Sequence, residues 1–253
     1  MDSRRDRSAQ DLSTTETPAL SVVIPVYNEG ENVASTLRGV VAKTRTRPLE
    51  VLVVHDMDED TTVPVVKRLQ AELPELRLHR NTLGRGVLNA MKSGLRAARA
   101  PYVLITMGDG SDNPADIDPM YQLARAGADV VAGSRYMRGG RQLGGPLLKR
   151  TMSRTAGLSL HWLGGLPVHD ATSNFRMYSK RLLNQVSIES KGGFELGLEL
   201  TVKAYRLGLK VAEVPTTWRD RTEGQSRFRL WTWLPRYLHW YWRGMGGRFG
   251  SSH

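Results

Sequence analysis

The chain has 253 residues, of which 40% are hydrophobic and 24% are charged, an ordinary composition for a folded protein with one substantial core. Its formal net charge of +11 is not ordinary, and it predicts an anionic partner such as nucleotide phosphates, an acidic membrane surface or nucleic acid. The absence of cysteine excludes disulfides, zinc–thiolate sites and thiol catalysis together.

The first 18 residues are polar, carry charges of both signs and lack an apolar central stretch, which predicts a disordered tail rather than a signal peptide. No run in the sequence approaches the roughly 18 consecutive apolar residues that a membrane-spanning helix needs. If the protein meets a membrane, we expect it to lie on the surface.

From residue 20 onward, short runs rich in valine, isoleucine and leucine alternate with segments whose apolar residues recur at helical spacing. In chain order we expect alternating strands and helices at residues 20–26, 31–41, 49–54, 62–73, 76–79, 86–98, 102–106, 114–126 and 129–132. This alternation predicts an α/β fold with a doubly wound, mostly parallel sheet and helices on both faces.

Ligands of such sheets bind beyond the carboxyl ends of the strands. Polar side chains follow four of the five expected strands, namely Asn28 and Glu29, then Asp56, Asp109 and Arg135. We therefore expect a binding site at this edge of the sheet, with the glycine-rich stretch 139–145 as a mobile loop over it.

Residues 107–114 read Met-Gly-Asp-Gly-Ser-Asp-Asn-Pro, a sequence typical of a strand end, an acidic turn and a helix start. A hard divalent cation such as Mg²⁺ or Mn²⁺ takes oxygen ligands and bridges to phosphate oxygens. Asp109 offers one such ligand and Asp112 or Ser111 a second, whereas the thioether of Met107 does not bind magnesium usefully. The turn predicts a nucleotide-diphosphate site with an unusual set of metal ligands.

Several segments together carry a family resemblance. They are Val-Val-Ile-Pro-Val-Tyr-Asn-Glu at 22–29, the acidic turn, Gly-Ser-Arg-Tyr at 133–136, Asp-Ala-Thr-Ser-Asn-Phe at 170–175 and Arg-Thr-Glu-Gly-Gln-Ser-Arg at 221–227. In this order, over about residues 20–230, the chain resembles the inverting family-two glycosyltransferases with the GT-A fold. More narrowly, it is similar to dolichol- and polyprenyl-phosphate mannosyltransferases.

The resemblance implies roles for individual residues. The nucleotide sugar is expected to contact Pro25, Tyr27, Glu29, Val54, Asp56, Gly108, Asp109, Arg221 and Arg227. The catalytic residues would be Asp109 and Arg135, and Asp109 would bind the metal, with Asp112 as the second ligand that the acidic turn offers. The groups holding the acceptor phosphate would be Arg135, Lys149 and Arg150. Asp170 and Glu195 are further candidates: Asp170 either faces substrate or pairs with an arginine, and Glu195 faces substrate or solvent.

The chain departs from the family pattern at Met107, where a carboxylate is usual, and at Ser111, where glutamine is usual. His55 stands where aspartate is common, and Arg227 replaces a lysine, which keeps the charge but changes the geometry. We expect Asp58 and Asp60 to lie in a solvated acidic loop, and His55 and His169 to be packed or exposed rather than metal ligands.

The implied reaction moves a hexose from a nucleotide sugar, GDP-mannose or UDP-glucose, to a polyprenyl phosphate. The resemblance favours mannose as the hexose. A lipid phosphate is already ionised near neutral pH and needs no general base, only cationic groups that hold it in line. The implied partners are the donor, the lipid acceptor, the membrane surface and a separate membrane protein, with no nucleic acid. The implied location is the cytoplasmic face of a membrane.

Five of the six tryptophans lie between Trp218 and Trp242, interleaved with arginines. On a helix, Leu230, Leu234, Tyr237, Leu238 and Tyr241 share one face, with Arg229, Arg236 and Arg243 opposite. This pattern favours a helix lying among lipid headgroups; the alternative is a helix packed on the domain or in a dimer interface. We therefore divide the chain into a tail (1–18), a GT-A domain (19–228), an aromatic and basic helix (229–245) and a second tail (246–253).

Other functions remain to be distinguished. A glycosyltransferase with a soluble hydroxyl acceptor would be insensitive to lipid phosphate. A sugar-phosphate nucleotidyltransferase normally carries a glycine- and lysine-rich phosphate loop near its N-terminus, and residues 20–40 contain none. A non-catalytic basic membrane-binding protein with a decayed site would bind no sugar nucleotide.

Overall fold

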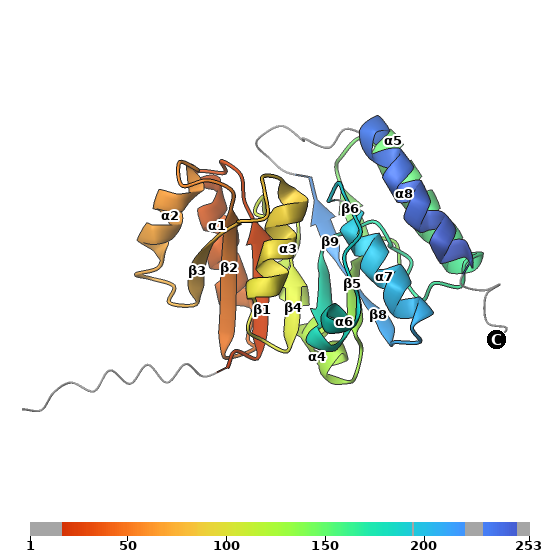
Figure 1. The fold of residues 1–253 in the computed structure, drawn as a ribbon, viewed down its shortest axis with the longest axis horizontal. Helices are drawn as coiled ribbons and strands as arrows, with labels where there is room; N and C mark the ends of the chain where they lie inside the picture. Colours follow the sequence, from red (N-terminus) through yellow and green to blue (C-terminus); the bar gives the residue numbers. More distant parts are fainter. Residues whose placement is uncertain (1–16, 194, 221–229, 247–253) are drawn as a thin grey trace, which may run out of the picture.

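In the computed structural model, which describes residues 17–193, 195–220 and 230–246, a seven-stranded sheet runs through the centre of the molecule (Figure 1). The strand order is β3 (Leu76–Arg80), β2 (Leu49–His55), β1 (Leu20–Pro25), β4 (Tyr102–Ile105), β7 (Arg176–Ser179), β5 (Val130–Ser134) and β8 (Val211–Pro215). All neighbouring pairs are parallel except the two that β7 makes with β4 and β5. The predicted α/β fold with a mostly parallel sheet is confirmed.

Helices cover both faces of the sheet. One face packs on α1 (Asn32–Lys43), α2 (Thr62–Leu69) and α4 (Ile117–Arg125), the last preceded by a short 3₁₀ helix, Pro114–Asp116. The other face packs on α3 (Val87–Ala97), α6 (Lys180–Gln185) and α7 (Leu196–Arg206). The helix expected at 62–73 ends earlier, at Leu69, with residues 70–72 in turn conformation.

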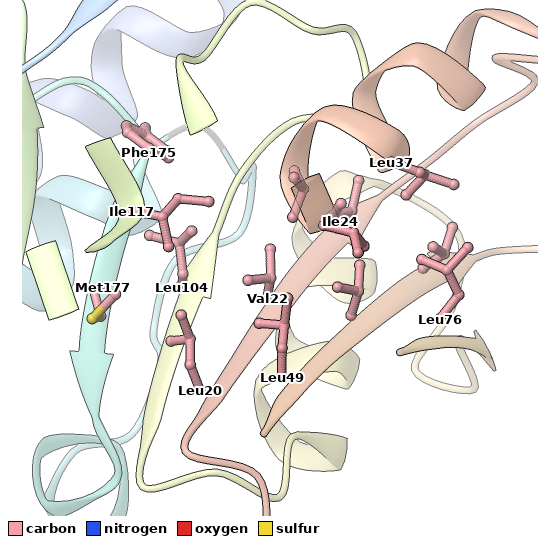
Figure 2. Packing of buried hydrophobic residues seen from close by; sticks show 14 of the residues in the cluster. Leu20, Val22, Ile24, Leu37, Leu49, Leu76, Leu104, Ile117, Phe175 and Met177 are labelled. Atoms are coloured by element: carbon pink, nitrogen blue, oxygen red, sulfur yellow. The ribbon is translucent and has the colours of Figure 1, made fainter. Parts of the chain in front are cut away.

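The side chains of β1 alternate between these two layers, as the two-residue period of a strand requires. Leu20, Val22 and Ile24 lie in the cluster that also contains Leu37 of α1 (Figure 2). Val23 points to the opposite cluster. β1 is therefore buried on both faces, which fixes the position of its carboxyl end.

Four further elements lie outside this core. They are the helices α5 (Leu147–Trp162) and α8 (Leu230–Met245) and the strands β6 (Arg141–Leu143) and β9 (Thr217–Arg219), which pair in a separate two-stranded sheet. In Figure 1, α5 and α8 run side by side beyond α7. The glycine-rich stretch 139–145 was expected to be a loop, but its centre forms β6 and pairs with β9. Among the described helices, none is both long enough and apolar enough to cross a bilayer.

The helix predicted near the C-terminus is present as α8, and its second half packs on the domain. Trp240 is buried, with the cations of Lys203 and Arg243 at 5.0 and 5.1 Å from its ring centroid. The Tyr241 hydroxyl donates to Ser159 Oγ of α5 at 2.9 Å. In contrast, Trp242 is 66% exposed. The side chains of 230–236, like Arg229, lie outside the described part of the chain, so the predicted arginine stripe is seen only at Arg243.

At the amino ends of the strands, away from the expected site, Glu50 of β2 is a buried carboxylate with four donors. It accepts hydrogen bonds from Ser21 Oγ at 2.5 Å, from the Arg99 backbone N–H at 3.0 Å and from Arg99 Nε at 2.7 Å, and it also pairs with Arg77. Burial alone would raise the pKa of Glu50, but these hydrogen bonds outweigh it and hold the pKa below its ordinary value.

This arrangement generates a stability prediction. The Glu50→Gln variant keeps the size of the side chain but turns an amide toward donors, and should lower the free energy of unfolding by about 2–3 kcal/mol at pH 7. Because the folded-state pKa lies below the unfolded value, the contribution is full above about pH 4.5 and is lost as the pH falls through the folded pKa. Urea unfolding at pH 7 and below pH 4 tests both points. The exposed Arg38–Glu72 pair supplies the control, since Glu72→Gln should change stability by under about 0.5 kcal/mol.

Candidate functional site

The carboxyl ends of β1, β2 and β4 meet at one edge of the sheet. Val26, just after β1, donates its backbone N–H to the carbonyl of Val54 at 2.9 Å. Thr36 of α1 donates its hydroxyl to the carbonyl of Gly108 at 3.2 Å. A Cβ on Gly108 would lie 3.2 Å from Val26 Cγ1 and 3.6 Å from the carbonyl oxygen of Pro25, so glycine allows the acidic turn to approach the end of β1 closely. The structure thus brings together Pro25, Val54 and Gly108, as the sequence predicted.

The loop that follows β1 is held by Asp60, which corrects the expectation that this residue is solvated. Asp60 is only 1% exposed. Its carboxylate accepts the backbone N–H of Asn28 at 3.0 and 3.1 Å and that of Thr62 at 2.8 Å, while Thr62 Oγ1 accepts the N–H of Glu29 at 3.0 Å. Asn28 itself has a left-handed backbone (φ +53°), and its side chain accepts the N–H of Thr61. Asp58, by contrast, is exposed as expected, beside Arg80.

The residues of this loop that were predicted to contact the nucleotide are accessible. Tyr27 is 38% exposed and Glu29 is half-buried. The predicted nucleotide contacts after β1 therefore lie on a backbone that is fixed from beneath by Asp60 and Thr62.

Asp56 ties the end of β2 to the segment that precedes α3. It accepts Asn81 Nδ2 at 2.7 Å and the backbone N–H of Gly86 at 2.7 Å. The buried Asn81 also donates to the carbonyl of Gly84 and accepts the N–H of Leu83. Asn81 was not predicted from the sequence, although it follows the third expected strand, as the candidate site residues follow the other strands.

The acidic turn after β4 presents two carboxylates. Asp112 accepts hydrogen bonds from Thr106 Oγ1 at 2.9 Å and from the Met107 N–H at 3.3 Å, and Asp109 accepts the Ser111 N–H at 3.1 Å. Removal from water and then the negative charge of Asp109 raise the pKa of Asp112 to about 7. The two carboxylates therefore lie close enough for the charge of Asp109 to act on Asp112.

The donor set fits a cation that also binds phosphate rather than one enclosed by protein. Within the described residues, no group of three or more His, Cys, Asp or Glu side chains forms a metal cage. Magnesium commonly binds through one or two carboxylates and completes its shell with water and substrate phosphates. Asp109 and Asp112 match that arrangement, while Met107 contributes only its backbone N–H to Asp112.

On the other side of β4, Arg135 forms a buried pair with Asp170. Arg135 Nε donates to Asp170 Oδ2 at 2.6 Å and Nη2 donates to Oδ1 at 3.0 Å, and the two side chains are 11% and 0% exposed. Burial alone would raise the pKa of Asp170, but the charge and hydrogen bonds of Arg135 hold it below its ordinary value. Of the two expectations for Asp170, the structure shows the pair with an arginine.

A second arginine, which the sequence reasoning also missed, supports the Asp170 loop. Arg176 of β7 is fully buried. Its Nη2 donates to the carbonyl of Asp170 at 2.6 Å, its Nε donates to the carbonyl of Ser173 at 3.0 Å, and Nη1 bonds Thr201 Oγ1. Its position directly after the 170–175 motif was the only signal in the sequence.

The first half of α5 lies beside Arg135. The Arg135 guanidinium lies 4.9 Å from the Tyr136 ring centroid, and the Tyr136 hydroxyl donates to Gln142 Oε1 at 3.1 Å and bonds Ser153 Oγ. The charge of Arg150, one turn earlier on α5, also acts on the Tyr136 hydroxyl. Arg135 and Arg150 therefore both lie near Tyr136. The side chain of Lys149, and the whole of Arg221 and Arg227, lie outside the described residues.

The segment 216–220 joins this region to the acidic turn. Arg219 donates its backbone N–H to the carbonyl of Ser111 at 2.9 Å, and Thr216 Oγ1 donates to Asp116 at 2.6 Å. Glu195, in contrast, is 1% exposed and accepts the backbone N–H groups of residues 191, 192 and 193, so it organises a glycine turn rather than facing substrate or solvent.

Comparisons with known proteins agree with the family resemblance. Residues 21–187 match the model of glycosyl transferase family 2. The chain is 32% identical over 234 residues to the polyprenol monophosphomannose synthase of Mycolicibacterium smegmatis, a match that covers 88% of this chain and 86% of that protein. It is 34% identical over 217 residues to the undecaprenyl-phosphate mannosyltransferase of Micrococcus luteus, covering 81% and 85%.

Among solved structures, the fold is similar to that of a mannosyltransferase from Pyrobaculum calidifontis in complex with GDP-Man and Mn²⁺. The TM-score is 0.62 at 18% identity, and the match covers 94% of this chain and 66% of the other. This likeness supports the GT-A fold, whereas membership of the family is shown by the sequence matches.

The contrast between two aspartates of one loop can be tested directly. Asp60→Ala leaves the buried N–H of Thr62 and the partly buried N–H of Asn28 without their acceptor, and it should lower the free energy of unfolding by about 2–4 kcal/mol. Asp58→Ala removes only an exposed ion pair and should change it by under about 1 kcal/mol. Chemical denaturation of both variants measures the difference; equal effects would contradict the assigned role of Asp60.

Proposed function

The chain belongs to glycosyl transferase family 2, and we propose that it transfers mannose, with inversion at the anomeric carbon, from a nucleotide-diphosphate sugar to a polyprenyl phosphate. The sequence matches to polyprenyl-phosphate mannosyltransferases support this substrate class. The observation that carries the proposal in the structure is Arg135, a cation fixed by Asp170 beside the carboxylates of the acidic turn. The charges of Arg135 and Asp112 are close enough to shift each other's pKa.

The donor would bind over β1, β2 and β4. Tyr27, Glu29 and Asp56 would hold the base and ribose on the loops described above, together with Pro25 and Val54, while Gly108 faces the diphosphate. GDP-mannose is the proposed donor because the relatives named above are mannosyltransferases. Arg221 and Arg227, which lie outside the described residues, would add positive charge to the donor phosphates.

The reaction joins a phosphate oxygen of the lipid to the anomeric carbon while the bond from that carbon to the nucleotide diphosphate breaks. The attacking oxygen is already ionised, so no proton has to be removed, and the bonding electrons leave with the diphosphate. Arg135, with Lys149 and Arg150, would hold the acceptor phosphate in line with that bond. Asp109 and Asp112 would hold a Mg²⁺ or Mn²⁺ ion, which when bound neutralises charge on the leaving diphosphate.

The acceptor lies in a bilayer, and we propose that α5 and α8 form the surface that meets it. Trp162 of α5 is 67% exposed and Trp242 of α8 is 66% exposed. Leu148 at the other end of α5 is also exposed, near the Arg150 side of the site. Tryptophan and leucine on such a face suit the headgroup boundary, and the net charge of +11 suits the anionic cytoplasmic leaflet. A membrane protein that holds the enzyme there would be a further partner.

Sugar transfer to a radiolabelled polyprenyl phosphate in detergent tests the reaction, with GDP-mannose and UDP-glucose offered separately, each with and without Mg²⁺ or Mn²⁺. We expect lipid-linked product with GDP-mannose and metal, and a loss of about 100-fold or more in kcat for Asp109→Ala. Asp58→Ala, exposed in a neighbouring loop, is the matched control and should keep its activity. Product only with soluble hydroxyl acceptors would overturn the lipid acceptor.

Binding to vesicles tests the membrane surface. Trp162→Ser and Trp242→Ser each remove an exposed indole and should weaken sedimentation with vesicles that contain anionic lipid by about tenfold. Leu83→Ser, which changes an exposed apolar residue before α3, should bind like the unaltered protein. Unchanged binding of the double tryptophan variant would place the membrane contact elsewhere.

A further inference from the structure

One cluster of titratable side chains has no part in the site described so far. His169 lies directly before Asp170 and is held by Glu213 of β8. Glu213 Oε2 accepts the backbone N–H of His169 at 2.8 Å, and Oε1 is in hydrogen-bond contact with His169 Nδ1. Because a carboxylate only accepts, Nδ1 carries the hydrogen. One carboxylate thus fixes both the backbone and the ring of His169.

Glu213 contacts the edge of the His169 ring, and α5 covers one of its faces. His161, in the last turn of α5, stacks on it with ring centroids 3.9 Å apart and planes inclined by 29°. His161 Nδ1 is 2.8 Å from the carbonyl oxygen of Leu166, which locks that ring in turn. The exposed Trp162 meets both imidazoles edge-on, at 4.9 and 6.4 Å between centroids.

The backbone at this point also touches α5 without a side chain between them. A Cβ on Gly157 would lie 2.3 Å from the carbonyl oxygen of His169 and 3.5 Å from the backbone nitrogen of Ala171. Real Cβ atoms do not approach backbone so closely, so the helix and the 169–171 backbone are in direct contact. A displacement of either is therefore felt by the other.

These contacts of His169 lie directly beside the carboxylate of Asp170. Asp170 receives the Arg135 guanidinium and backbone N–H, and its Oδ1 also accepts the N–H groups of Thr172 and Ser173. Arg176 holds the carbonyl of the same residue from within the core. Because two of these donors are N–H groups of the same loop, the position of the Asp170 carboxylate depends on the loop backbone, which Glu213 holds at His169.

We propose that His169, clamped by Glu213 and stacked under His161, is a positioning residue for the acceptor phosphate. It acts through Asp170 on the guanidinium of Arg135 and does not touch the substrate itself. The inference rests on the proposed function, because it takes Arg135 as the group that holds the lipid phosphate. It assigns a role to a histidine that the sequence predicted to be merely packed or exposed.

The consequence should fall on one substrate only. Small misplacements of a group that aligns a reactant have large effects on its use. Losing the clamp should therefore raise KM for the lipid phosphate about tenfold. KM for the sugar nucleotide should stay within about twofold, because its proposed contacts lie on the loops after β1, β2 and β4, which Asp60, Asp56 and Thr36 hold independently.

The experiment compares His169→Ala, His169→Asn and His169→Gln in the full chain. The amide nitrogen of asparagine can take the place of Nδ1 and donate to Glu213, whereas glutamine fills the space but carries its amide nearer the Nε2 position. We expect the asparagine variant to retain the acceptor KM and the alanine and glutamine variants to raise it. Glu72→Gln, which changes an exposed ion pair with Arg38 outside the site and the proposed membrane surface, is the control and should behave like the unaltered protein.

Two readouts separate the outcomes. Steady-state KM values for both substrates are measured alongside binding of farnesyl phosphate, a short lipid phosphate, by calorimetry, with thermal unfolding to confirm the fold of each variant. If His169→Ala does not fold, the asparagine and glutamine pair decides. Equal acceptor KM values for that pair, or parallel changes in both substrates' KM, would overturn the positioning role.

Failure of the proposed function gives a different pattern. In that case the unaltered protein would neither bind farnesyl phosphate nor transfer sugar to a lipid phosphate, and Arg135→Lys would leave every measured constant unchanged. If the unaltered protein and Arg135→Lys differ in acceptor use while His169→Gln does not, the function stands and only the role of His169 is lost.

Discussion

The buried ion pair between Arg135 and Asp170 is the constraint on which this half of the molecule depends. Taking two charges out of water is costly, and the pair is tolerable only because hydrogen bonds satisfy both groups. Asp170 reaches that state through two N–H donors of its own loop and the bidentate contact from Arg135. The sheet supplies the geometry, since β7 enters antiparallel between β4 and β5 and delivers the 169–175 loop to the end of β5.

The same insertion of β7 divides the site into two halves with a common design. On one side a buried aspartate, Asp60, holds the backbone of the loop after β1 through N–H donors. On the other, Asp170 holds an arginine after β5. In both cases a buried carboxylate fixes residues that we propose contact a substrate. A transferase of two anionic substrates has a physical reason for this arrangement, because donor and acceptor must be aligned independently before they react.

The sequence predicted the succession of strands and helices along the first half of the chain, since buried runs and helical spacing alternate regularly to residue 132. It also placed Asp56, Asp109 and Arg135 after strand ends, whereas the order of the strands in the sheet comes from the structure. It did not predict β7, because a four-residue strand that begins with a buried arginine lacks the pattern of either a core or an edge strand. Asp60 was misplaced for a related reason. An acidic cluster looks solvated unless the backbone donors around it are known, and those depend on the left-handed turn at Asn28. The packed face of α8 was also not readable from the sequence. Trp240 is buried against Lys203 of α7 and Arg243 of α8, and the helical projection had assigned Arg243 to the side opposite the apolar face.

α5 is the element that connects these constraints to a surface. Its amino-terminal half borders Arg135 through Ser153 and Tyr136, its middle rests on the backbone of His169 at Gly157, and it ends in the exposed Trp162. A helix with no side chain between itself and the Asp170 loop cannot shift without moving that loop. If the outer face of α5 lies in the headgroup region, the bilayer also contacts the helix that lies beside Arg135, the residue proposed to hold the acceptor phosphate. Binding to the membrane and alignment of the phosphate would then be coupled through α5. The hydrogen bond from Tyr241 joins α8 to α5, so α8 extends the same surface.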